Sequence, residues 1–220
     1  MAQKKVFIDR EGNQWFKRNK IAGEKLDAKR QVDPVLKILA AENISPDRVL
    51  EIGASNGWRL SVLKEAWPNA KMYGIEPSAD AVNEPYQGVE LKQGTADELP
   101  YEESFFDVVI FGFCLYLCDR EDLFKIAQEA DRVLKDDGLL VIYDFCPDDT
   151  YRNNYTHEEG MYSYKMDYSK LFSWNPAYRM TKEHKQPHPG YEHEDTPDNR
   201  VAVHLLRKQM HNGWHKKKSD

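Results

Sequence analysis

The sequence predicts an α/β domain with a mostly parallel sheet. Residues 49–52 form a short apolar run that ends in a turn of small residues at 53–57 and continues into an amphipathic pattern. Strands at 71–75, within 88–112 and at 139–143 recur between helical segments in the same way. Because strands alternate with helices, we expect ligands to bind beyond the carboxyl ends of the strands.

Capping and stop residues bound the predicted helices. Asp33 is suited to cap a helix that has Pro34 at its first position, and Pro68 stops the helix that follows the small-residue turn. The predicted helices span about residues 33–43, 60–67 and 119–134, and the last two strands span about 178–186 and 200–207.

Length and charge limit the classes of protein to which the chain can belong. The 220 residues fit one domain, and the net charge of −6 argues against binding to nucleic acid or to an anionic membrane. No apolar run has the length of a signal peptide or a membrane span, so we expect a cytoplasmic protein without membrane insertion. Cys114, Cys118 and Cys146 lack CxxC spacing, so neither a disulfide framework nor a zinc site is expected.

Composition divides the chain into three parts. We expect an N-terminal arm or lid at 1–31, a domain at 32–209 and a disordered tail at 210–220. Trp15 and Phe16 are too large to leave in water, so they either anchor the arm or form part of a lid over a ligand.

The small-residue turn is suited to a ligand that approaches the backbone closely. Gly53 and Gly57 allow a tight turn, but their spacing is not the GxGxxG of a dinucleotide fingerprint. Glu51 lies just before the turn, where it would repel a pyrophosphate and attract a cation. The sulfonium and amino groups of S-adenosylmethionine fit that preference. The alternative is an ordinary strand-turn-helix corner of an α/β protein.

A second acidic residue follows the next strand. Glu76 lies 25 positions after Glu51, at the carboxyl end of the strand at 71–75. A carboxylate at this place can accept hydrogen bonds from both hydroxyls of a ribose. The alternative is that Glu76 caps the helix that begins near Pro77.

Together these segments resemble the class I S-adenosylmethionine-dependent methyltransferases. Motif I of that family has an acidic residue before Gly-x-Gly-x-Gly, and this chain has Glu51-x-Gly53-x-Ser55-x-Gly57. Residues 88–112 resemble the type 11 subgroup, and residues 132–138 resemble its phrase Arg-x-Leu-Lys-Pro-Gly-Gly. The resemblance covers about residues 48–145.

The resemblance implies a Rossmann-like fold. Its seven strands would be ordered 3-2-1-4-5-7-6, with helices on both faces and a small lid insertion before strand 6. The cofactor would be S-adenosyl-L-methionine and the product S-adenosyl-L-homocysteine. Ala96 would offer its amide to the adenine, and Asp97 or Thr95 would face the exocyclic amine. The predicted cofactor-binding residues are Glu51, Gly53, Ala54, Ser55, Asn56, Gly57, Glu76, Pro77, Thr95, Ala96, Asp97, Phe111, Gly112 and Phe113.

The acceptor is predicted to bind against an insertion at about 145–177, which is dense in tyrosine. Aromatic faces interleaved with polar side chains suit a sugar, although the rings could equally form the core of a small helical lid. The predicted substrate-binding residues are Trp15, Arg18, Tyr116, Arg152, Tyr155, Tyr162 and Tyr164.

Methyl transfer depends mainly on positioning, and only an alcohol acceptor needs a base. His157 is the first candidate base because imidazole titrates near neutral pH, with Glu158 and Asp144 behind it. The alternative for His157 is a surface histidine. His184, His188 and His193 are separated by prolines and match no metal-site spacing, so no metal is predicted.

The sequence therefore predicts a methyltransferase that acts on a small-molecule or glycan acceptor. The leader and the insertion resemble those of enzymes of surface-polysaccharide biosynthesis, which favours O-methylation of a sugar or sugar acid. The alternatives are another alcohol, amine or carboxylate, or a non-catalytic scaffold that binds the cofactor. A homodimer is left open by the sequence.

Overall fold

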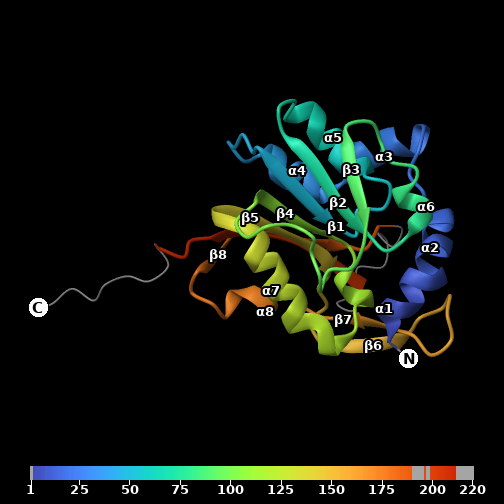
Figure 1. Ribbon diagram of the computed structural model, residues 1–220. Helices are drawn as coiled ribbons and strands as arrows, with labels where there is room; N and C mark the ends of the chain where they lie inside the picture. Colours follow the sequence, from blue (N-terminus) through green and yellow to red (C-terminus); the bar gives the residue numbers. More distant parts are fainter. Residues whose placement is uncertain (1, 190–195, 197–198, 212–220) are drawn as a thin grey trace, which may run out of the picture.

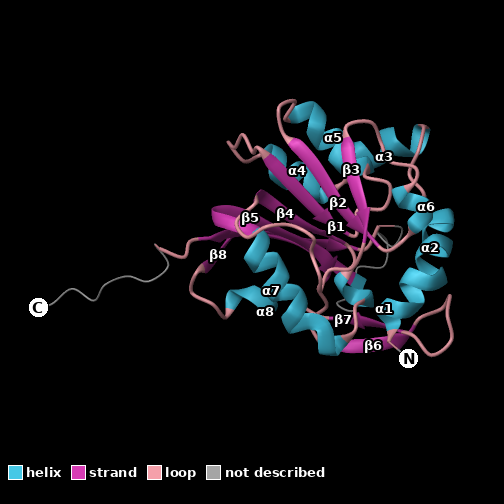
Figure 2. Ribbon diagram, viewed as in Figure 1, coloured by secondary structure: helices cyan, strands magenta, loops and turns pink. Residues whose placement is uncertain are grey.

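The computed structural model describes residues 2–189, 196 and 199–211. Its main element is a seven-stranded sheet in the order β3-β2-β1-β4-β5-β9-β8, with helices on both faces (Figures 1 and 2). The strands are β1 (Arg48–Ile52), β2 (Lys71–Glu76), β3 (Val89–Gln93), β4 (Phe106–Gly112), β5 (Leu134–Phe145), β8 (Tyr178–Pro187) and β9 (Arg200–Lys208).

The observed sheet confirms the predicted fold class and strand order. Strands β1 to β5 pair in parallel, and β9 pairs antiparallel with both β5 and β8. Because β6 (Tyr151–Asn154) and β7 (Tyr162–Lys165) form a separate two-stranded sheet, β8 and β9 are the sixth and seventh strands of the main sheet. The predicted order 3-2-1-4-5-7-6 is therefore the observed one.

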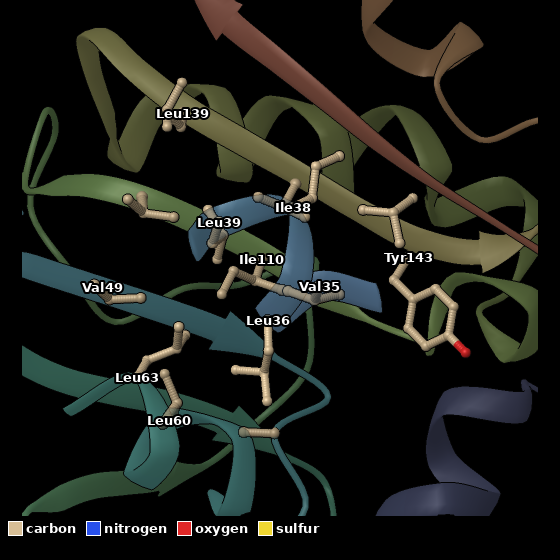
Figure 3. Close-up of a cluster of buried hydrophobic side chains, with 14 of the residues drawn as sticks. Val35, Leu36, Ile38, Leu39, Val49, Leu60, Leu63, Ile110, Leu139 and Tyr143 are labelled. Atoms are coloured by element: carbon tan, nitrogen blue, oxygen red, sulfur yellow. The ribbon is translucent and has the colours of Figure 1, made fainter. Parts of the chain in front are cut away.

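One face of the sheet packs against α4 (Pro34–Ala40) and α5 (Trp58–Ala66). Figure 3 shows Val35 and Leu39 of α4 in one cluster with Ile110 of β4. Every second residue of a strand points to the same face of the sheet, which explains why these strand residues meet α4 and α5.

The other face packs against α7 (Leu123–Val133) and α8 (Lys170–Ser173). Ile126 of α7 lies here with Leu140 and Ile142 of β5, whereas Leu139 and Val141 belong to the first face. The central strands are therefore buried on both sides over their apolar stretches, such as residues 139–142 of β5.

Local chemistry explains where α4 begins. The carboxylate of Asp33 accepts a hydrogen bond from the amide of Leu36 at 3.0 Å, and Pro34 takes the first helical position, as predicted. The helix ends at Ala40, a few residues before the predicted end near Asn43. Ser78 caps α6 (Ala79–Val82) in the same way, accepting from the amide of Ala81.

The insertion between β5 and β8 is a hairpin with a short helix rather than a helical lid. β6 and β7 pair antiparallel, and α8 follows them. Tyr168 and Phe172 are buried against the sheet, so part of the aromatic content of the insertion belongs to the core.

The N-terminal arm is helical, with α1 (Gln3–Val6), the π-helical turn Phe7–Glu11 and α2 (Gly12–Asn19), followed by α3 (Glu24–Val32). Figure 1 shows α1 and α2 running past the carboxyl ends of the parallel strands toward the hairpin. The arm is fastened there, because the side-chain amide of Gln3 donates to the carbonyl oxygens of Leu117 (2.9 Å) and Tyr162 (3.1 Å).

Among the described residues, no helix combines the length and apolar composition needed to cross a membrane. The predicted disordered tail at 210–220 lies outside the described residues from position 212 onward. Both edge strands are rich in exposed charged side chains, including Glu90 and Lys92 on β3 and Lys182 and Glu183 on β8.

Candidate active site

A cavity lies across the carboxyl ends of β3, β2, β1 and β4. Residues 52–53, 75–77, 94–97 and 112–114 line it from the strand ends, and Phe7, Gly12 and Trp15 of the arm cover it. Four neighbouring strand ends thus form the wall of one cavity, as expected for an open parallel sheet.

The turn after β1 brings the backbone to this cavity. Gly53, Ser55 and Gly57 all have positive φ angles, of 75°, 51° and 77°. A Cβ on Gly53 would lie 2.7 Å from the Cβ of Cys114, so glycine is required there by space as well as by conformation. Ser55 adopts the same left-handed region, so the serine that replaces the usual glycine does not alter the path of the turn.

Glu76 is the buried carboxylate of the cavity. One of its oxygens accepts from the amide of Ser55 at 2.8 Å and the other from the amide of Ser78 at 3.0 Å. A carboxylate has about four acceptor positions, so capacity for two further donors remains. Burial raises the pKa of Glu76 to about 7, and the two amides oppose that rise. Because the side chain of Ser78 caps α6, the capping alternative for Glu76 is not what the structure shows.

Glu51 does not have the position expected from the sequence. Its carboxylate is 1% exposed and forms an ion pair with Arg59, which also pairs with Asp33 at 3.0 Å. A Cβ on Gly112 would overlap with an oxygen of Glu51, so β4 covers this carboxylate. Glu51 is absent from the cavity lining, and burial raises its pKa to about 7 although Arg59 opposes the rise. The predicted contact of Glu51 with the cofactor stays a prediction, and the charge of Arg59 opposes that of the carboxylate in this structure.

The loop after β3 meets the arm at one end of the cavity. Thr95, Ala96 and Asp97 all line the cavity. Lys4 of α1 forms ion pairs with Asp97 at 2.5 Å and with Asp122 at 3.1 Å. Although burial opposes the shift, the hydrogen bonds from Lys4 and Thr95 lower the pKa of Asp97. Asp97 therefore holds the arm in this structure.

The segment after β4 forms the opposite end of the cavity. Gly112, Phe113 and Cys114 line it, and Phe113 has a φ of 69°, which is rare for a bulky residue. This conformation turns the Phe113 ring toward Tyr143 (centroids 4.9 Å apart) and Phe145 (5.0 Å).

Several predicted cofactor residues support the cavity rather than line it. Phe111 is fully buried in the core because it alternates with Gly112 along β4. Ala54 is buried in the cluster on the other face, and the side-chain amide of Asn56 donates to the carbonyl of Ile21. Gly57 precedes α5, where a Cβ would lie 2.8 Å from the side chain of Val89.

Comparison with known proteins agrees with this arrangement. Residues 50–142 match a family model described as a methyltransferase domain (Methyltransf_11). The crystal structure of the PH0226 protein from Pyrococcus horikoshii superposes with a TM-score of 0.65 at 14% identity, covering 93% of this chain and 99% of that one. The chain therefore shares the Rossmann-like fold of that protein.

A second solved structure has the same fold and contains a ligand. It is the 1,6-didemethyltoxoflavin-N1-methyltransferase of Burkholderia thailandensis, with bound 1,6-didemethyltoxoflavin and S-adenosylhomocysteine. The TM-score is 0.65 at 15% identity, and the match covers 94% of this chain and 87% of that one.

Among curated proteins, the chain is 30% identical over 113 residues to a fatty-acid O-methyltransferase of Mycolicibacterium smegmatis, covering 49% of this chain and 40% of that protein. It is 29% identical over 150 residues to a demethylmenaquinone methyltransferase of Thermotoga maritima, covering 66% and 62%. The chain therefore matches less than two thirds of the length of these relatives.

Within this fold, the predicted substrate residues fall into two groups. Trp15 lines the cavity, and Tyr116 packs beside Phe113 at 5.2 Å. Tyr155 and Arg18 instead meet at Glu11, a carboxylate 2% exposed, which accepts from the Tyr155 hydroxyl at 2.8 Å and pairs with Arg18 at 2.5 Å. The latter group joins the arm to the hairpin.

The remaining tyrosines of the hairpin stack with arginines away from the cavity. Arg152 lies 4.4 Å from the ring centre of Tyr162, and Arg120 lies 4.3 Å from that of Tyr164. Neither tyrosine is among the described residues that line the cavity.

None of the three candidate bases lines the cavity formed by the described residues. His157 is exposed on the turn between β6 and β7, and Glu158 forms an ion pair with Arg10 of the arm. Asp144 is 1% exposed and accepts from the backbone amides of Leu115, Tyr116 and Phe145. Burial raises its pKa to about 7, and its hydrogen bonds give it a structural use. The sequence alone did not show that His157 is exposed, that Glu158 is ion-paired and that Asp144 is buried.

The histidines on β8 and just after it also differ in environment. His184 is exposed beside Gln186, whereas the ring of His188 stacks on Phe145 with centroids 5.3 Å apart. His193 lies outside the described residues.

Sequence reasoning missed the residues that connect the arm to the cavity. Lys4 approaches Asp97 and Asp122, and Asp119 accepts from the backbone amides of Gln3 and Lys4 at 2.9 Å. These contacts join positions more than 90 residues apart, so no local spacing could indicate them.

Proposed function

We propose that this protein is an S-adenosylmethionine-dependent methyltransferase that binds its cofactor in the cavity described above. The observation that carries the proposal is the buried carboxylate of Glu76 in a cavity formed by four parallel strand ends. The match of residues 50–142 to a methyltransferase domain and the fold support it.

The residues present fit this cofactor. Glu76 retains acceptor capacity for the two ribose hydroxyls, and the largely apolar walls formed by Ile75 and Ala96 suit the flat adenine. The segment 112–114 and Gly53 line the end proposed for the methionine part. When bound, the cofactor supplies a sulfonium whose methyl group is already activated for transfer.

The chain's own task is then to position the acceptor and exclude water. Trp15 of the arm lies over the cavity, and the arm is held by Lys4 and by Gln3. We propose that the acceptor enters near Trp15 and Phe113, where the rings of Tyr116 and Phe145 give an apolar surface.

The carboxylates that line the cavity also bear on the acceptor. Asp97 and Asp122 are paired with Lys4, and Asp119 accepts two backbone amides. Because these groups are engaged, and because no candidate base lines the described cavity, we favour an acceptor that carries its own nucleophile. A carboxylate or an acidic phenol is ionised near pH 7, and a weakly basic amine is neutral there, so each meets that requirement without deprotonation by the protein.

This reasoning ranks the sugar acceptor predicted from the sequence second. A sugar hydroxyl needs a base, and Tyr162 and Tyr164 stack with arginines outside the cavity lining. The matched relatives are named for fatty acids and demethylmenaquinone, which are not sugars.

The proposal is tested by measuring binding and turnover separately. Calorimetry with S-adenosylhomocysteine should give one site, which Glu76→Ala weakens. Transfer of labelled methyl should then be assayed with fatty acids, amines, phenols or quinols, and nucleotide sugars. Turnover confined to nucleotide sugars would reverse the ranking of acceptors. Tight binding with no transfer to any acceptor class would support the scaffold alternative, and absence of binding would refute the proposal.

A further inference from the structure

Three metal-ligating side chains lie together near the end of β5, and the carboxylate of Asp167 lies beside one of them. The donor atoms of Cys146, Glu183 and His204 all lie within 4.8 Å of one another. Nε2 of His204 is 3.3 Å from Oε1 of Glu183 and 3.8 Å from Oδ1 of Asp167. None of the four is among the described residues that line the cofactor cavity.

The sheet explains why residues so distant in sequence meet. Glu183 of β8 pairs directly with His204 of β9, which pairs with Ile142 of β5. Cys146 follows the end of β5 on the same side as Ile142, because side chains four positions apart share a face of an extended strand. Asp167 comes from the insertion, just before α8, which lies beside β8 (Figure 1).

The four residues differ in burial in a way that suits a metal site with an entry path. Cys146 and His204 are each 2% exposed, whereas the side chains of Asp167 and Glu183 are 26% and 41% exposed. Two ligands are thus fixed in the interior, and two reach them from the solvent side. Asp167 is itself oriented by the amide and hydroxyl of Ser169, at 3.0 and 2.6 Å.

We infer that Cys146, Asp167, Glu183 and His204 form a binding site for a zinc-like divalent cation. Tetrahedral zinc with bonds of about 2.0 Å to nitrogen or oxygen and about 2.3 Å to sulfur places its ligands about 3.3 to 3.8 Å apart. The 3.3 Å between His204 and Glu183 matches the separation of two nitrogen or oxygen ligands, and the 3.8 Å between His204 and Asp167 requires a small approach of that carboxylate. The thiol needs only a small approach, and Glu183 is exposed enough to move. Sulfur and imidazole ligands disfavour magnesium and calcium.

Lys185 offers the competing explanation for the cluster. Its ammonium lies 3.2 Å from Oε1 of Glu183, so the lysine already supplies a positive charge beside these groups. A metal would have to displace that ion pair. This competition leads to a test that misfolding cannot imitate, because removal of the lysine charge should increase metal affinity.

The role of such an ion would be structural. It would join the end of β5, strands β8 and β9, and the insertion, at a distance from the cofactor cavity. The sequence concealed the site because its ligands stand at positions 146, 167, 183 and 204, without a CxxC or HxxxH spacing.

The test uses the untagged full chain, freed of metal with a chelator and titrated with Zn²⁺ against a chromophoric competitor. We expect one ion per chain and an increase in the melting temperature with zinc. Glu183→Gln should weaken binding at least tenfold, and Lys185→Gln should strengthen it several-fold. His184→Gln changes an exposed neighbour on the same strand and should leave the affinity unchanged.

Cobalt substitution gives a second readout. The Co²⁺ form of the wild type should show tetrahedral visible bands and a thiolate charge-transfer band, and Cys146→Ser should lose the latter while its circular dichroism remains native. Absence of zinc binding would overturn the inference. So would binding that is insensitive to Glu183→Gln and Cys146→Ser, or a Lys185→Gln variant with no gain in affinity.

Discussion

The wall and the cover of the cavity are built in different ways. The wall consists of four strand ends whose backbone turns and glycines lie between residues 52 and 114. The cover is a helical arm held by polar side chains, such as the pairs of Lys4 with Asp97 and of Arg10 with Glu158. The wall therefore owes its shape to the backbone of the sheet, whereas the cover depends on a few polar contacts that single substitutions can remove.

The largest effect is expected at the base of the wall, from Arg59→Met. The substitution would leave the carboxylates of Glu51 and Asp33 buried without their cation. We expect the free energy of unfolding to fall by about 3–5 kcal/mol. Urea denaturation measures the change.

Arg30→Met is the matched control, because it removes an ion pair with Glu65 between exposed side chains. It should cost at most about 1 kcal/mol. If both variants lost equally little stability, the buried cluster would not support the wall as described.

Glu76→Ala should have the next largest effect, on cofactor binding. Loss of a charged hydrogen-bond acceptor should weaken binding of S-adenosylhomocysteine by about 1–3 kcal/mol, roughly 5- to 150-fold. Calorimetry measures the change in affinity, on a variant that a thermal melt has shown to be folded. Glu90→Ala, on the exposed side of β3, is the control, and an unchanged affinity in Glu76→Ala would remove the carboxylate from the proposed site.

The pH dependence of cofactor affinity tests the same carboxylate. Burial raises the pKa of Glu76 to about 7 in the free protein, and ribose hydroxyls donate to its ionised form. Binding therefore lowers the pKa, so affinity should rise as pH increases through 7 and fall below it. The gain between about pH 6 and about pH 8 should approach tenfold. Glu76→Gln should show a flatter profile, and an identical slope in that variant would assign the titration to another group.

Lys4→Met should have the smallest effect, confined to the cover. Its ammonium is about one third exposed, so loss of its two ion pairs should cost at most about 1 kcal/mol. We expect faster amide hydrogen exchange in α1 and faster cofactor dissociation, with little change in melting temperature. Lys5→Met, whose partner Asp9 lies on the same arm, should leave both rates unchanged. Equal effects from the two lysines would mean that Lys4 does not fasten the cover.

The difference between the wall and the cover also decides which features could be predicted from the sequence. The α/β class, the cap at Asp33 and the position of Glu76 at a strand end followed from patterns within a few residues, because strands, caps and turns depend on local chemistry. The strand order followed from the resemblance to a known family. Phe111 was assigned to the site because the resembled family holds the methionine part of the cofactor at the end of the fourth strand, and the alternation of that strand directs its side chain into the core.

Patterns along the sequence did not supply the partners of individual side chains. Glu51 was expected to meet the cofactor directly, but its neighbour across the first turn of α5 is Arg59. His157 and Glu158 were selected for their chemistry, but the hairpin holds them at the surface beside the arm. The spacing of residues in the sequence does not indicate that the N-terminal arm lies over the ends of the strands.

The charged edges of the sheet have a consequence for the behaviour of the protein at high concentration. β3 and β8 each end the sheet with unpaired backbone groups, and an uncharged flat edge would accept a strand from a neighbouring molecule. The lysines and glutamates on these two strands oppose that addition, because docking a further strand would strip water from them. Both edges of the sheet therefore disfavour edge-to-edge association of two molecules.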